Sequence, residues 1–157
     1  MRTAAKQRGA AAVEFGILLV PLVLMAFGTT EFGRAIYQYN TLAKATRDAA
    51  RVLSEHSPTD ANYPVAAAKC LAVFGNRSCS GSPLVPGLTT ERVFVCDRVD
   101  SSDCPGQAFS NVETGSGVIN LVQVKIGGYQ FTSLVPFVTG FTTITFDDIG
   151  TTMRQVL

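Results

Sequence analysis

The first part of the chain is dominated by one long apolar run. Between Arg8 and Glu31 lie 22 residues, and Glu14 is the only charged one among them. A helix rises about 1.5 Å per residue, so about 20 apolar residues cross the ~30 Å hydrocarbon core of a bilayer. The pattern therefore predicts a membrane-spanning helix over residues 10–30, with Pro21 bending it.

Beyond residue 30 the pattern becomes amphipathic. Apolar residues recur at three- and four-residue steps, which is typical of one face of a helix. The residues of this stripe are Phe32, Ile36, Tyr39, Leu42, Ala43, Ala49, Ala50 and Leu53. We expect the helix to continue to about Ser54, where the sequence His-Ser-Pro-Thr-Asp (56–60) ends it, and to pack this stripe on its own domain.

The remaining pattern predicts short elements of both kinds. They are a helix at about 62–74 and strands at about 92–96, 118–133 and 141–153. Residues 76–90 and 97–117 have the composition of loops. Taken alone, the Gly127-Gly128 pair indicates a hairpin turn within residues 118–133. The fold class predicted is α+β, with a long N-terminal helix whose second half packs on a small antiparallel sheet.

Charge excludes one class of function and orients the span. The chain has 13 basic and 12 acidic residues, so it is not a strongly basic nucleic-acid binder. Arg2, Lys6 and Arg8 precede the apolar run without any acidic residue, whereas the other flank is nearly neutral. The positive-inside rule places the N-terminus in the cytoplasm and residues 31–157 across the membrane.

The four cysteines, Cys70, Cys79, Cys96 and Cys104, lie on the predicted oxidising side. A structural zinc site usually has ligand pairs two to four residues apart, and these spacings are wider. Two disulfides are therefore favoured over a metal site. Of the three possible connectivities, the sequence-local pairing of Cys70 with Cys79 and Cys96 with Cys104 is preferred.

Glu14 is the residue that a plain membrane anchor leaves unexplained. An unpaired carboxylate within a span costs about 2.5–3.5 kcal/mol on insertion scales, so a partner cation is expected. Snorkelling to the cytoplasmic interface is the alternative. Two further alternatives for the segment are a simple signal anchor and a cleaved signal peptide, the latter because Ala26-Phe27-Gly28 supplies small residues after the apolar region.

The stretch Arg8-Gly9-Ala10-Ala11-Ala12-Val13-Glu14-Phe15 resembles a type IV prepilin processing site of the Tad (tight adherence, type IVb) variety. The resemblance implies that residues 1–9 are a basic leader, cleaved after Gly9 by a prepilin peptidase. Glu14 would then be the fifth mature residue, beside the aromatic Phe15. The new α-amino group of Ala10 would supply the missing cation, and the pair would fix the register of packed helices.

The C-terminal part resembles the TadE-like branch of that system, through Val122–Phe131, Leu134–Phe137, Ile144–Phe146 and Thr151–Arg154. The resemblance favours one continuous strand with a bulge at Gly127-Gly128 and a turn at 135–140. It implies a minor pilin or pseudopilin in the bacterial inner membrane, with a periplasmic domain, or incorporated into an extracellular pilus. The partners implied are the prepilin peptidase, other Tad pilins, the assembly platform and membrane lipid.

Other functions are weighed against this structural one. A membrane-anchored binding domain could use loops 76–90 and 97–117. Asp97, Asp100 and Asp103 could gather around calcium, but their spacing lacks that of an EF-hand loop. His56 lies near serines and an acid, but no G-x-S-x-G motif occurs, and a His at a helix end more often serves the helix dipole. We therefore expect no catalytic residues, no metal and no cofactor.

Overall fold

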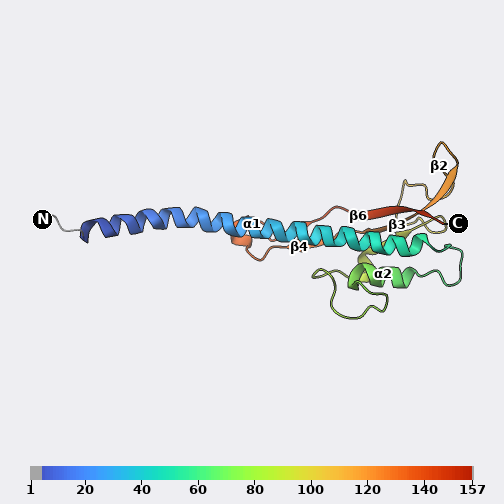
Figure 1. Ribbon diagram of the computed structural model, residues 1–157, viewed down its shortest axis with the longest axis horizontal. Helices are drawn as coiled ribbons and strands as arrows, with labels where there is room; N and C mark the ends of the chain where they lie inside the picture. Colours follow the sequence, from blue (N-terminus) through green and yellow to red (C-terminus); the bar gives the residue numbers. More distant parts are fainter. Residues whose placement is uncertain (1–4, 157) are drawn as a thin grey trace. The chain divides into compact units, whose positions relative to one another are not determined.

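The computed structural model describes the backbone of residues 5–156 and the side chains of residues 9–156, and it is α+β (Figure 1). Much of the predicted basic leader thus lies outside the described residues. The helices are α1 (Ala5–Ser54), α2 (Val65–Phe74) and α3 (Pro136–Thr139), with a 3-10 turn at Thr90–Arg92. The strands are β1 (Val93–Cys96), β2 (Val112–Glu113), β3 (Val118–Ile126), β4 (Gln130–Thr132), β5 (Thr143–Thr145) and β6 (Ile149–Gln155).

The chain forms two compact units, and α1 contributes to both. The first unit combines helix residues up to Ile36 with Thr132–Thr143. The second combines Tyr37–Phe131 with the residues from Ile144 onward. The second unit holds the larger sheet and the main core.

The sheet of the second unit is antiparallel and is built around β3. Strand β1 pairs with the C-terminal half of β3, with Val93 opposite Ile126. Strand β6 pairs with most of β3, from Gln155 opposite Asn120 to Ile149 opposite Ile126. The two-residue strand β2 pairs with its start. Because alternate β3 residues Val122, Val124 and Ile126 are fully buried, one face of β3 supplies the core.

The second half of α1 covers this core, as predicted. Leu42, Ala49, Ala50 and Leu53 are fully buried and belong to one apolar cluster with residues of β3. Burial of a large aliphatic side chain contributes about 1.5–3 kcal/mol. The predicted stripe is buried only from Leu42 onward, since Phe32 is 67% exposed within the first unit.

The predicted strand over 118–133 is wrong in its continuity, because residues 127–129 separate β3 from β4. The cause is local. A Cβ at Gly127 would lie 3.0 Å from the Phe94 ring, and Gly128 has φ +61°, a conformation that a strand does not use. The chain nevertheless does not reverse here, and the turn falls at α3, as the family resemblance implies. Ser133 N–H donates to the carbonyl of Thr142 at 2.9 Å and closes this turn.

Three smaller differences have equally local causes. The closing strand is split into β5 and β6, and the predicted loop 97–117 contains β2. Helix α2 begins at Val65 rather than at about residue 62, because Pro64 occupies its N-cap. It ends as predicted at Gly75, which adopts the left-handed conformation with φ +71°.

Candidate processing and assembly segment

The predicted processing and register residues lie on one exposed stretch of α1. Gly9, Ala10, Glu14 and Phe15 are all helical and all exposed. Ala10 and Glu14 are four residues apart, so they lie on the same face, about 6 Å apart along the axis. Helical side chains lean toward the N-terminus, which directs Glu14 toward Ala10.

The apolar segment that follows has no cover within the described chain. From Val13 to Phe27 every large apolar side chain is at least 36% exposed. Among the described residues, α1 is the one helix both long and apolar enough to cross a membrane, and its most apolar window is not buried at all. Such a surface requires either lipid or other apolar helices around it.

The hydroxyl groups near the end of the segment are satisfied within the helix. Thr29 Oγ1 donates to the carbonyl of Met25 at 2.5 Å, and Thr30 Oγ1 donates to that of Ala26 at 2.8 Å. This i−4 bonding removes the cost of placing a free hydroxyl in an apolar environment. Both threonines are therefore compatible with a membrane span that extends to residue 30.

Glu31 and Arg34 form a polar clamp at the end of the apolar segment, which the sequence did not predict. Arg34 Nη2 lies 2.9 Å from Glu31 Oε2 and also donates to the carbonyl of Thr132. The same carboxylate accepts the Leu134 N–H at 3.4 Å. The Arg34 hydrogen bond, opposed by burial, holds the pKa of Glu31 below its usual value. The i,i+3 spacing of opposite charges was the available signal, but nothing in the sequence pointed to residues 132–134 as their partners.

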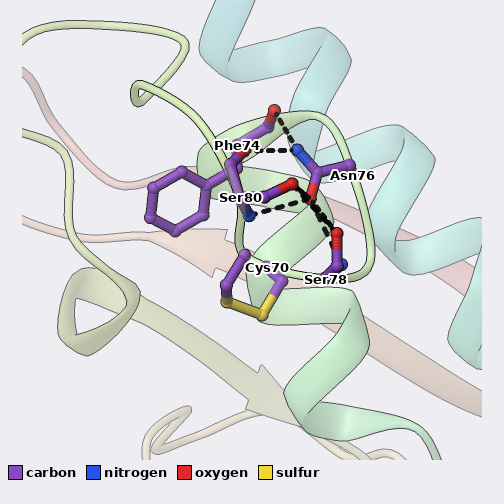
Figure 2. Close-up of a disulfide and its surroundings, with 6 residues drawn as sticks. Cys70, Phe74, Asn76, Ser78 and Ser80 are labelled. Carbon is purple, nitrogen blue, oxygen red and sulfur yellow. Dashed lines mark hydrogen bonds between the residues drawn. A yellow bond between two sulfur atoms is a disulfide. The ribbon is translucent and has the colours of Figure 1, made fainter.

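The four cysteines form the two sequence-local pairs that the spacing favours, Cys70–Cys79 and Cys96–Cys104. The second pair is buried with Phe109, where Leu121 packs against it. The first closes a loop that Asn76 organises (Figure 2).

Asn76 holds this first loop with both ends of its amide. Its Nδ2 donates to the carbonyls of Phe74 and Ser80, at 3.2 and 2.7 Å. Its Oδ1 accepts the N–H groups of Ser78 and Ser80, at 3.2 and 3.1 Å. The arrangement is a structural one, in which one side chain replaces the backbone bonds that an irregular loop lacks.

The aspartates considered for calcium serve turns instead. Asp97 is buried, and its Oδ1 accepts the N–H groups of Val99 and Asp100 at 2.8 and 3.0 Å. Asp100 in turn accepts bonds from Ser102, which lower its pKa. Within residues 9–156 no group of three metal-ligating side chains comes together.

His56 serves the end of α1. Its Nδ1 lies 2.8 Å from the carbonyl of Val52, a helix-terminal contact. The neighbouring Ser54 donates to the carbonyl of Arg51, and Ser57 contacts Thr59. His56, Ser54 and Ser57 are thus each engaged in a hydrogen bond that serves the local structure.

An open hollow of about 230 Å³ lies beside loop 97–117. Its lining includes Tyr63, Lys69, Asp97 and Asp103. Burial, followed by the charge of Asp97, raises the pKa of the Tyr63 phenol, so this hydroxyl stays protonated. The Tyr63 hydroxyl lies 3.1 Å from Gln155 Nε2, which ties β6 to this region and gives the tyrosine a structural role.

Comparison with known proteins bears on the N-terminal part of the chain. No curated protein and no solved structure matches the chain. The model of the family described as TadE-like protein matches residues 9–51, a segment that begins at Gly9 and lies wholly within α1. The predicted TadE-like resemblance is therefore confirmed over residues 9–51, the segment that carries the prepilin-like motif, whereas the C-terminal stretch that suggested this branch lies outside the match.

Proposed function

We propose that this protein is a minor pilin or pseudopilin, a structural component of a Tad-type pilus or secretion machine. The observation that carries the proposal is the TadE-like match, which starts at Gly9 and includes Glu14 within the apolar, exposed segment of α1. Assembly through that helix requires no catalytic residue in this chain. The bare surface of α1 supplies the packing area.

The first step of the proposal is processing on the cytoplasmic side of the inner membrane. A prepilin peptidase hydrolyses the peptide bond after Gly9, which releases the basic leader as a carboxylic acid and leaves a protonated amine on Ala10. Removal of the leader also removes Arg2, Lys6 and Arg8. The basic residues that hold the N-terminus in the cytoplasm are then gone, and the helix can be withdrawn from the membrane into a filament.

The second step is charge pairing within the helix bundle. The Ala10 amine would lie about one helical turn from Glu14 of the same chain. In a bundle of packed helices it could instead reach Glu14 of a neighbouring subunit. A paired charge in an apolar environment costs far less than an isolated one, so only registers that bring amine and carboxylate together are favourable.

Substitution of Glu14 tests the proposal. Glu14→Ala should still insert and still be cleaved after Gly9, since it removes a charge from the span and leaves the scissile bond intact. Crosslinks to other Tad pilins and pilus-dependent adhesion should fall sharply. Glu14→Gln should be intermediate, because an amide accepts one hydrogen bond but carries no charge.

Thr29→Ala is the matched control, since it removes a polar group from the same helix that bonds only to its own backbone. It should assemble like the unaltered chain. Normal assembly of Glu14→Ala would show that the carboxylate only reaches the lipid–water interface and does not set the register of packed helices.

A further inference from the structure

The turn between β4 and β5 is unusually apolar and exposed. We call residues 134–141 the tip loop. No charged residue occurs between Lys125 and Asp147, and the two large side chains at the tip, Leu134 and Phe137, are 71% and 82% exposed. A soluble domain rarely presents such side chains together on a loop without a partner.

The polar clamp fixes the position of the tip loop along α1. Arg34 Nη2 bonds both Glu31 and the Thr132 carbonyl, and Glu31 accepts the Leu134 N–H, so residues 132–134 are fastened to α1 beside the Glu31 carboxylate. The short segment that follows β4 lies alongside α1, within the same compact unit (Figure 1). Glu31 is the first charged residue after the apolar run, so the loop lies where the span meets water.

Three backbone N–H groups of the tip loop are bonded within the loop. The N–H groups of Val138 and Thr139 donate to the carbonyl of Val135, at 2.9 and 3.1 Å, and that of Gly140 donates to the carbonyl of Pro136 at 2.9 Å. The Thr139 hydroxyl lies 3.1 Å from that of Ser133. Unpaired N–H groups are costly in lipid, and these internal bonds remove that cost for the three groups that make them.

We propose that the tip loop inserts into the outer headgroup–acyl boundary of the inner membrane, with Leu134 and Phe137 as its anchors. We favour the lipid surface as the partner of the tip loop because the loop lies beside α1, at the end of the lipid-facing span. Interfacial segments bury apolar side chains about 5–10 Å into this boundary. The inference rests on α1 spanning the membrane, as in the proposed function.

Tryptophan substitution tests the insertion directly, because the chain contains no tryptophan. Phe137→Trp in the full chain is reconstituted into vesicles of phosphatidylethanolamine and phosphatidylglycerol. We expect blue-shifted emission, protection from aqueous iodide, and stronger quenching by a label near the headgroup than by one at the acyl-chain end. Leu134→Trp should behave alike, and mapping of both disulfides verifies the fold of each variant.

Two controls separate the tip loop from the span. Phe27→Trp, within the apolar segment, should be quenched by lipid labels and reports insertion of α1. Val99→Trp, exposed between Arg98 and Asp100, should be quenched by iodide alone.

Iodide quenching of Phe137→Trp together with lipid quenching of Phe27→Trp would overturn the inference and leave the span intact. Iodide quenching of both would overturn the span and the inference with it. A blue shift of Phe137→Trp that disappears as lipid is added at constant protein would overturn it in favour of a second copy of the chain as occupant.

Discussion

Glu14 and Glu31 bracket the apolar segment of α1 and find their counter-charges in different ways. Glu31 has Arg34 three residues away and the N–H of Leu134 from a distant part of the chain. For Glu14, the proposed counter-charge is the amine that cleavage creates on Ala10. The sequence alone singles out Glu14, because a charge within an apolar run is conspicuous. It does not single out Glu31, because a charge at the end of such a run is ordinary.

Acid should loosen the tip loop from α1. A carboxyl group whose pKa is lowered on folding stabilises the folded state above its unfolded pKa, and the stabilisation is lost as pH falls through the folded value. Since the pKa of Glu31 lies below its ordinary 4.5, the attachment should persist at neutral pH and weaken only below about pH 4.5. Hydrogen exchange of the Leu134 N–H, followed from neutral pH to below pH 4.5, measures this loosening.

Glu31→Gln is the matched variant for this effect. It keeps an acceptor for the Leu134 N–H but removes the titrating group. Its exchange at Leu134 should be faster at neutral pH and nearly independent of pH between 3 and 7, apart from the intrinsic pH dependence of exchange. An unchanged acid response in Glu31→Gln would assign the titration to another group.

At the scale of elements, α1 is one helix with two different surfaces. Its N-terminal part is exposed throughout, whereas Leu42, Ala49 and Leu53 are fully buried against the sheet. Leu42→Ala should therefore lower the free energy of unfolding of the detergent-solubilised chain by about 2–5 kcal/mol. Val99→Ala, an exposed aliphatic position in the second unit, should change it by about 0.5 kcal/mol or less. Equal effects in denaturant titrations would contradict the assignment of the core to this half.

The two disulfides should differ in their contribution to stability. Each closes a loop of similar length, with sequence separations of 9 and 8, worth about 2–3 kcal/mol by loop entropy. Cys96 and Cys104 are buried, however, whereas Cys79 is exposed. Replacing Cys96 and Cys104 by serine also buries hydroxyl groups. This double variant should therefore lose more free energy of unfolding than the serine variant of Cys70 and Cys79. Denaturant midpoints compare the two; equal losses would contradict the argument.

Elements with strong periodicity were predictable, and their interruptions were not. The long helix, α2 and the alternating β3 follow from patterns of apolar residues. The break after Ile126 depends on the distance between Gly127 and Phe94, which are far apart in sequence. The Gly127-Gly128 pair indicated that the regular strand changes at this point, but the sequence left open whether the change is a turn or a bulge. The close approach of Phe94 to Gly127 and the positive φ of Gly128 mark the interruption in the structure.

At the scale of the whole molecule, the sequence predicted the fold class and the N-terminal segment better than the connections between distant segments. The apolar run, Glu14 and the local cysteine spacing are each visible within about 30 residues. The clamp from Arg34 to Thr132 and the contact from Gln155 to Tyr63 join residues more than 90 positions apart. Such contacts carry no local pattern, so the tip loop became interpretable only once its place along α1 was known.

The N-terminus of the protein recovered from the inner membrane tests the central claim most directly. In cells that contain its prepilin peptidase, intact mass and N-terminal sequencing should find a chain of 148 residues that begins at Ala10, and Gly9→Val should retain all 157. A chain that begins at Thr29, or an unaltered chain that keeps its leader in the presence of active peptidase, would contradict the account.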